Sequence, residues 1–106
     1  MAEEAKQTIK CTVQFSGGLE MYFDNKKEQV LELSCPVSAS YTVRDLIEKL
    51  RTGYMSDKEE MFVQANTVRP GIIVLINDTD WELEGTNDYA IQNNDTVAFI
   101  STLHGG

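Results

Sequence analysis

The stretch TVRDLIEKLRTG, residues 42–53, is the only strongly helical pattern in this chain of 106 residues. From Val43, apolar residues recur at positions i, i+3, i+4 and i+7, which gives one apolar stripe along a helix. Thr42 followed three residues later by Asp45 is the hydroxyl and carboxylate pattern of a capping box. Gly53 is a natural helix stop. The sequence therefore predicts one amphipathic helix that crosses a single face of a sheet.

The residues before this helix alternate between apolar and polar side chains. Apolar residues occupy every second position from Ile9 to Phe15, the period of a half-buried strand. The pair Gly17-Gly18 predicts a turn, and residues 19–23 resume the alternation, so we expect a β-hairpin there. Residues 24–27 then form a polar turn, and residues 30–33 extend the strand or add a short one.

Further strands are predicted after the helix. Residues 61–63 read as a short strand, and the turn signal Pro70-Gly71 precedes the β-branched run Ile72–Ile76. A continuous apolar run of this length predicts a central strand with both faces covered. Residues 96–100 form the last strand, which leads directly into the end of the chain.

This order of elements predicts a single α+β domain with the β-grasp fold of ubiquitin, a mixed sheet with one main crossing helix. A small ferredoxin-like α+β domain is the alternative. We expect a disordered lead over residues 1–7, the β-grasp domain over residues 8–102 and a flexible Gly-Gly tail over residues 103–106.

Charge and composition limit the classes of function. Nine basic and seventeen acidic side chains give a net charge of −8, which disfavours direct binding to nucleic acid. The N-terminus is acidic and polar, unlike a signal peptide. The longest aliphatic run, residues 72–76, is too short to cross a membrane. We expect a soluble monomer in the cytoplasm, with presence in the nucleus also compatible, that contacts proteins rather than nucleic acid or membranes.

The chain offers little chemistry of its own. Its two cysteines and one histidine provide no zinc ligand set at the usual spacings. Cys11 falls on the apolar face of the first strand and is expected to be buried, whereas Cys35 precedes Pro36 in a predicted loop and is expected to be more accessible. Trp81 is expected to pack against the domain. No nucleophile and base pair or phosphate-binding glycine loop is present, so we expect no enzymatic activity, no metal and no bound cofactor.

The most informative feature for function is the end of the chain, Gly105-Gly106. An end without Cβ atoms can be threaded into the active site of another protein. A free carboxylate on it can be adenylated with ATP and passed to sulfur or to an amine. Leu103 would be a docking contact, and His104 fits a solvated residue or a partner contact equally well. A frayed, inert end is the alternative.

Three blocks of sequence carry a resemblance to a known family. They are TVRPGIIVLIND over residues 67–78, DWEL over residues 80–83 and FISTLHGG over residues 99–106. With these blocks the chain resembles the eukaryotic ubiquitin-related modifier family, the ubiquitin-like sulfur carriers of tRNA thiolation. Residues 1–61 agree mainly in the order of elements and in the Gly17-Gly18 turn. Arg69, within the first block, is either solvated or pairs with acidic side chains of a partner.

The resemblance implies a carrier that is a substrate of other enzymes. An E1-like enzyme with a rhodanese-type sulfurtransferase activity would consume ATP to adenylate Gly106, and sulfur would displace AMP to leave a thiocarboxylate. A separate tRNA thiolase complex would use this sulfur for the wobble uridine of cytosolic tRNAs. The family resemblance also implies conjugation to lysines of target proteins. Leu103, His104 and Gly105 would form the tail that the activating enzyme recognises.

Two other functions remain open from the residues. One is a β-grasp sulfur carrier for molybdopterin or thiamine synthesis, although residues 67–83 favour the tRNA branch. The other is an adaptor domain that partners bind non-covalently through its sheet, with an inert tail.

Overall fold

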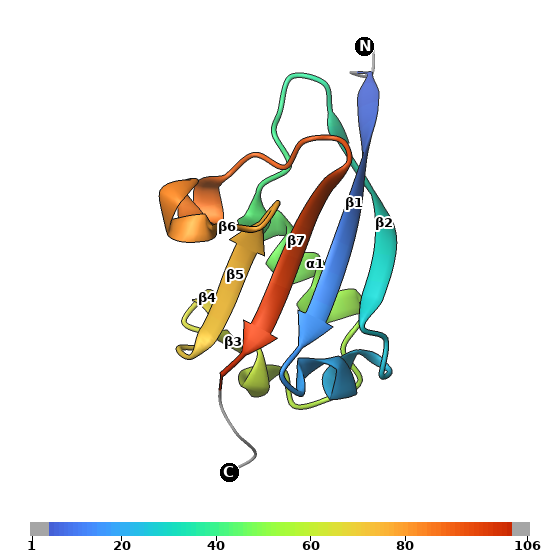
Figure 1. Cartoon of the computed structure of the whole chain (residues 1–106). Coiled ribbons are helices and arrows are strands. Elements are labelled where there is room, and N and C mark those ends of the chain that lie inside the picture. Colours follow the sequence, from blue (N-terminus) through green and yellow to red (C-terminus); the bar gives the residue numbers. More distant parts are fainter. Residues whose placement is uncertain (1–4, 103–106) are drawn as a thin grey trace.

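The computed structural model describes residues 5–102, which form a five-stranded mixed sheet with one α-helix across one face (Figure 1). The strand order is β2-β1-β7-β5-β6, with β1 and β7 parallel and the other neighbours antiparallel. The strands of this sheet are β1 (Lys6–Ser16), β2 (Glu28–Pro36), β5 (Ile72–Ile76), β6 (Thr79–Asp80) and β7 (Asp95–Ser101). This arrangement confirms the predicted β-grasp fold.

Smaller elements fill the connections. A separate two-stranded sheet pairs β3 (Val63–Gln64) with β4 (Thr67–Val68). The short 3₁₀ helices are η1 (Leu19–Phe23), η2 (Glu59–Met61), η3 (Trp81–Leu83) and η4 (Thr86–Asp88). Trp81 packs against the core as predicted. Among residues 5–102, no helix has the length and apolar character needed to cross a membrane.

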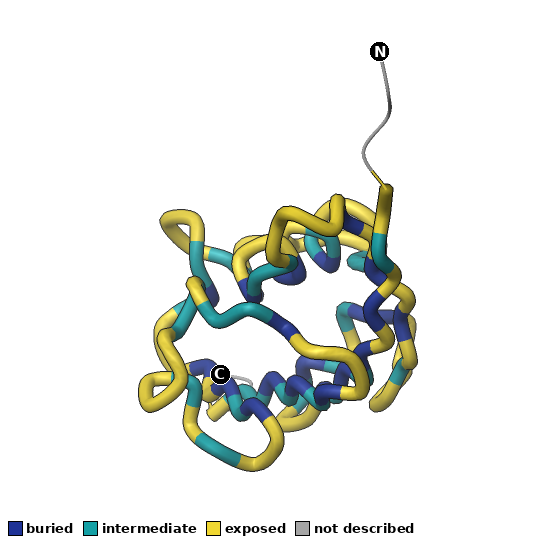
Figure 2. Tube along the Cα trace, turned by 90° about the horizontal axis from the view of Figure 1, so that it is seen from above, coloured by how far each residue is buried: buried dark blue, intermediate teal, exposed yellow. Residues whose placement is uncertain are grey.

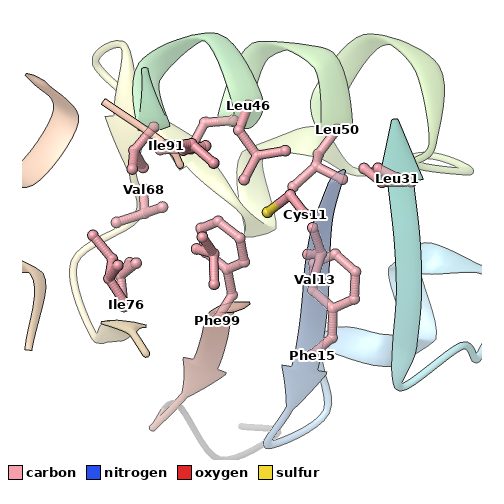
Figure 3. Close-up of a cluster of buried hydrophobic side chains, with 14 of the residues drawn as sticks. Cys11, Val13, Phe15, Leu31, Leu46, Leu50, Val68, Ile76, Ile91 and Phe99 are labelled. Carbon is pink, nitrogen blue, oxygen red and sulfur yellow. The ribbon is translucent and has the colours of Figure 1, made fainter. Parts of the chain in front are cut away.

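The helix α1 (Val43–Gly53) forms where the sequence predicts it. The Thr42 hydroxyl accepts the backbone N–H of Asp45 at 3.3 Å, and the Asp45 carboxylate accepts the backbone N–H of Thr42 at 3.0 Å. This reciprocal capping box satisfies donors that a helix start leaves without partners. The predicted stripe is buried and faces the sheet; Figure 3 shows Leu46 and Leu50 above the strands.

The core lies between α1 and the inner face of the sheet. Alternate residues of the strands are buried, and this alternation is visible along the chain in Figure 2. Phe15 of β1 stacks on Phe23 with ring centroids 3.9 Å apart, and Phe62 packs edge-to-face on Phe99 of β7 at 5.2 Å. These rings and the aliphatic residues around Cys11 and Ile76 form one continuous cluster. Figure 3 shows part of it, with Phe15 and Phe99 labelled.

The predicted strand over residues 19–23 is wrong, because these residues form the 3₁₀ helix η1. In a strand, Leu19, Met21 and Phe23 would share one face, but Met21 is 63% exposed while Leu19 and Phe23 are buried. The buried pair is four residues apart and lies on one side of a helical turn. The partner of β1 in the hairpin is β2, and residues 17–27 form the connection.

Three other details differ from the sequence predictions. The strand β1 begins at Lys6, within the segment expected to be a disordered lead. The strand predicted at residues 61–63 begins at Val63, after η2. The run Ile72–Ile76 is a strand, but only one of its faces is covered. Ile73 is 42% exposed, because α1 lies on the opposite face of the sheet.

The prediction for the cysteines is half right. Cys11 is fully buried on the inner face of β1, as expected. Cys35 lies in β2 rather than in the predicted loop. It is buried, but its exposed fraction of 9% exceeds the 0% of Cys11, so the expected order of accessibility is confirmed. The strand continues through Cys35, because the Cys35 side chain follows Leu31 and Leu33 at every second position and points into the core with them.

Candidate functional site

The predicted reactive and recognition residues, Leu103, His104, Gly105 and Gly106, lie outside the described residues. The structure describes the point from which they follow, the end of β7. Ser101 is the last residue of this strand, and Thr102 is the last described residue. We call Ser101 and Thr102, together with the residues Gly17 and Gly71 that contact them, the tail root.

Thr102 is bound to the turn that precedes β5. Its backbone N–H donates to the carbonyl of Gly71 at 2.9 Å, and its hydroxyl donates to the same carbonyl at 2.6 Å. The turn itself is closed by the N–H of Ile72, which donates to the carbonyl of Arg69 at 3.1 Å. The turn at Pro70-Gly71 was predicted from the sequence, but its role in holding Thr102 was not.

Gly17 forms the other side of the tail root. A Cβ atom at this position would lie 2.1 Å from the carbonyl oxygen of Ser101, and its φ is +72°. Only glycine allows this close approach of two backbone segments. The sequence identified Gly17-Gly18 as a turn, and no local signal could reveal that the turn packs against a strand more than eighty residues away.

A small cavity of about 130 Å³ opens beside the tail root. Its lining is mostly apolar and includes Leu19, Met21 and Met61, with Arg69 and Ser101. The Arg69 guanidinium lies 3.2 Å from the Met61 sulfur.

Arg69 is the charged residue among the described side chains that line this cavity. Arg44 pairs with Asp88 at 3.3 Å, and Arg51 pairs with Glu48 and Glu59. Within the part of the chain that the structure describes, Arg69 pairs with no carboxylate, although the chain carries seventeen acidic residues. Arg69 is half-buried. Both predictions for it, a solvated side chain and pairing with an acidic group of a partner, stay open.

An apolar patch lies next to the tail root on the sheet face opposite α1. In the register of β5 and β7, Ile73 faces Ile100 and Leu75 faces Ala98. These four side chains share the outer face because the inner positions of both strands alternate with them. Figure 1 views the molecule from this face, with α1 behind β7 and β1. We refer to these four residues as the sheet patch.

The buried groups Cys11 and Asp95 have structural roles. Burial, followed by the nearby Asp95 carboxylate, raises the pKa of the Cys11 thiol to about 12, so this thiol is a poor nucleophile. The buried Asp95 accepts hydrogen bonds from the Tyr89 hydroxyl, the Asn77 amide and the Gln92 N–H. Over residues 5–102, no group of His, Cys, Asp and Glu side chains is arranged to hold a metal ion.

Comparisons with known proteins agree with this picture. The model of the family Urm1, ubiquitin-related modifier, matches residues 10–106. The chain is 47% identical over 98 residues to the ubiquitin-related modifier 1 homolog of Drosophila simulans, which covers 92% of this chain and 95% of that protein. It is 46% identical over 114 residues to ubiquitin-related modifier 1 of Chaetomium thermophilum, over the full length of both chains.

A solved structure agrees as well. The solution structure of Urm1 from Trypanosoma brucei superimposes with a TM-score of 0.79 at 40% sequence identity, covering 93% of this chain and 97% of that one. Sequence and fold together show that the chain belongs to the ubiquitin-related modifier family of ubiquitin-like carriers and modifiers.

Proposed function

We propose that this protein is a sulfur carrier whose Gly106 carboxyl becomes a thiocarboxylate and supplies sulfur for the 2-thiolation of wobble uridine in cytosolic tRNAs. The observation that carries the proposal is that the family match extends through the terminal Gly105-Gly106. The same activated carboxyl would also be conjugated to lysines of target proteins. In this role the protein acts in the cytoplasm as a substrate rather than as an enzyme.

The proposed chemistry uses the terminal carboxylate as an acyl group. One of its oxygens attacks the α-phosphate of ATP on an E1-like enzyme, and pyrophosphate leaves. The outer sulfur of an enzyme persulfide then attacks the acyl carbon, and AMP leaves. A thiol of that enzyme attacks the inner sulfur, which forms an enzyme disulfide and releases the thiocarboxylate.

The chain's own thiols support this assignment of the sulfur to the terminus. A carrier could instead hold sulfur as a cysteine persulfide, which requires an accessible thiolate. Cys11 and Cys35 are both buried, and the pKa of Cys11 is raised to about 12. Neither thiol is suited to receive sulfur from a large donor enzyme, which leaves the C-terminal carboxyl.

The surroundings of the tail root support docking of the activating enzyme there. The hydrogen bonds of Thr102 to Gly71 fix the point at which the reactive segment leaves the domain. The sheet patch and the cavity beside Arg69 lie next to this point and offer apolar contacts. Apolar surface beside this point is suited to contact with another protein.

Intact-mass measurement tests the proposal. The full chain is incubated with ATP, a persulfide donor and the activating enzyme of a family relative. We expect the mass change of one oxygen replaced by one sulfur, and no change for the chain that lacks Gly106. In cells, tRNA wobble uridines should lose their 2-thio group when only the shortened chain is present. If tRNA thiolation stayed normal in these cells while molybdopterin or thiamine synthesis was lost, a carrier for that other pathway would be favoured. If neither changed, the adaptor with an inert tail would be favoured.

A further inference from the structure

We propose that the outer edge of β2 is a docking site for an extended segment of a partner protein, which adds to the sheet as a new strand. The segment that fits carries Lys or Arg on both sides of an apolar residue, at alternate positions. This inference does not depend on the chemistry of Gly106.

The edge formed by β2 is long and regular. The strand β2 borders the sheet with nine residues, whereas β6 at the other border has two. Its pairing with β1 runs without interruption from Lys6 and Pro36 to Gln14 and Glu28. Figure 1 shows β2 at the right-hand border of the sheet with no strand beyond it. A long, regular edge strand is a template for another strand.

Backbone groups of β2 point outward from this edge. The N–H of Phe15 donates to the carbonyl of Lys27 at 2.8 Å, so these residues form a hydrogen-bonded pair of the β1–β2 ladder. Hydrogen-bonded and non-bonded pairs alternate in an antiparallel ladder. The N–H and carbonyl groups of Val30, Glu32 and Ser34 therefore point away from β1. No residue in the range 5–102 forms a hydrogen bond with them.

The side chains on the outer face of this edge combine one apolar residue with two acidic ones. Val30 is 54% exposed and lies between Glu28 and Glu32 at alternate positions. Glu28 accepts a hydrogen bond from the neutral Gln14 amide at 2.9 Å. Lys10 faces Glu32 across the ladder, but no ion pair joins either glutamate to a described residue. Opposite charges on neighbouring strands stabilise their pairing, so cations flanking an apolar residue complement this row.

A second copy of this chain is a poor occupant for the same reason. Two β2 strands paired antiparallel around Val30 would place Glu28 of each copy against Glu32 of the other. Each copy also carries a net charge of −8, which adds long-range repulsion. The edge thus discourages self-association through charge and not through a bulge, and it remains open to a strand of opposite charge.

The position of the edge allows the partner and the tail root to be used together. The strand β1 separates β2 from β7, and β7 separates both from β5. A strand on β2 therefore leaves Thr102, Gly71 and the sheet patch uncovered. The site fits a partner that holds the carrier while its C-terminus is in use.

The test measures binding of a defined peptide to the ¹⁵N-labelled full chain. The probe is acetyl-Thr-Lys-Ile-Val-Ile-Lys-Thr-amide. The matched control is the same peptide with N-methyl groups on the valine and both lysines, whose N–H groups would face β2. We expect the unmodified peptide to slow amide hydrogen exchange at Val30, Glu32 and Ser34 by about tenfold or more, because these groups become paired. The N-methylated peptide should not bind, since it cannot complete a ladder.

Two sets of variants separate charge from backbone pairing. Glu28→Gln with Glu32→Gln should weaken binding by about tenfold. The same charge change at the exposed residues Glu82 and Glu84, in the double variant Glu82→Gln with Glu84→Gln, should not weaken it. Val30→Pro should abolish binding, because it removes one of the outward N–H donors that the added strand needs. The variant should still fold, because proline is tolerated on the open side of an edge strand.

The proposal would be overturned if both peptides bound equally, if exchange slowed at the sheet patch rather than at β2, or if both double variants lost affinity alike. Sedimentation that showed a dimer broken by Val30→Pro would assign the edge to a second copy instead. The peptide pair keeps the test decisive even if Val30→Pro fails to fold. Sulfur loading of Gly106 plays no part in these measurements, so failure here would leave the proposed function intact.

Discussion

Gly17 shows how a single residue position can depend on a contact that is remote in sequence. We expect Gly17→Ala to lower the free energy of unfolding by more than about 2 kcal/mol, because a methyl group would meet the Ser101 carbonyl at 2.1 Å and the backbone φ is positive. Gly18→Ala is the matched control, since Gly18 also has a positive φ but no atom near its missing Cβ. Urea unfolding of both variants measures the difference. Equal losses would mean that the contact with Ser101 adds nothing beyond backbone strain.

Cys11 gives a prediction about pH at the same scale. Its pKa in the folded protein is about 12, above the ordinary value of a thiol. The unfolded chain therefore loses the thiol proton at lower pH than the folded chain does, and stability should fall as pH rises from about 9 towards 12. Cys11→Ala should be less stable than the parent at pH 8, but its own decline over this range should be smaller. Urea unfolding at several pH values checks this, and parallel declines would contradict it.

The thiols also test the burial assignments directly. In the folded state we expect a variant that retains only Cys11 to react more slowly with a thiol reagent than a variant that retains only Cys35. Cys11 is completely buried and its thiolate is disfavoured by Asp95. Cys35 is also buried, so the difference should be smaller than the sequence suggested. Equal rates in native conditions, with equal rates in urea as the control, would show that both thiols react only after unfolding.

At the scale of elements, α1 is the part of the fold that local sequence determines most fully. Its cap, its apolar stripe and its stop were all predicted, because each depends on residues within one or two turns. We expect Thr42→Ala to cost about 1 kcal/mol of stability through loss of the capping bond to Asp45. The double variant Thr42→Ala with Asp45→Ala should cost less than the sum of the two single variants, because both act on one reciprocal pair. Additive losses would mean that the two capping hydrogen bonds act independently, which would contradict this prediction.

The elements that the sequence predicted poorly depend on distant partners. Residues 19–23 alternate like a strand, but Phe23 stacks on Phe15 and Met21 faces outward, so packing selects a 3₁₀ turn. The run Ile72–Ile76 is as apolar as a fully buried strand, yet Ile73 is exposed on the sheet patch. Composition alone cannot separate an apolar side chain on an open face of a sheet from one in the core. The tail root was missed for the same reason, since Thr102, Gly71 and Gly17 meet only in the folded sheet.

At the scale of the whole molecule, the fold holds Ser101 and Thr102 at a fixed point at one end of the sheet. The parallel pairing of β7 with β1 places the tail root at the same end of the sheet as the Gly17-Gly18 turn, and the bonds to Gly71 hold it there. The position of the terminal carboxyl relative to this anchor should therefore matter more than the composition of the tail.

Three variants of the C-terminus test this requirement. Deleting Gly106, or adding one alanine after it, should abolish adenylation, because a displacement of about 1 Å in a reacting group can cost on the order of a hundredfold in rate. Gly106→Ala keeps the carboxyl in register and should be less severe, although its methyl group crowds the acyl carbon. Release of pyrophosphate by the activating enzyme measures the first step. Amide spectra that match the parent over residues 5–102 would show that the domain is unchanged. Full activity of the extended chain would mean that the enzyme does not read the distance from Thr102 to the carboxyl, and the tail root would then lose its proposed role as an anchor.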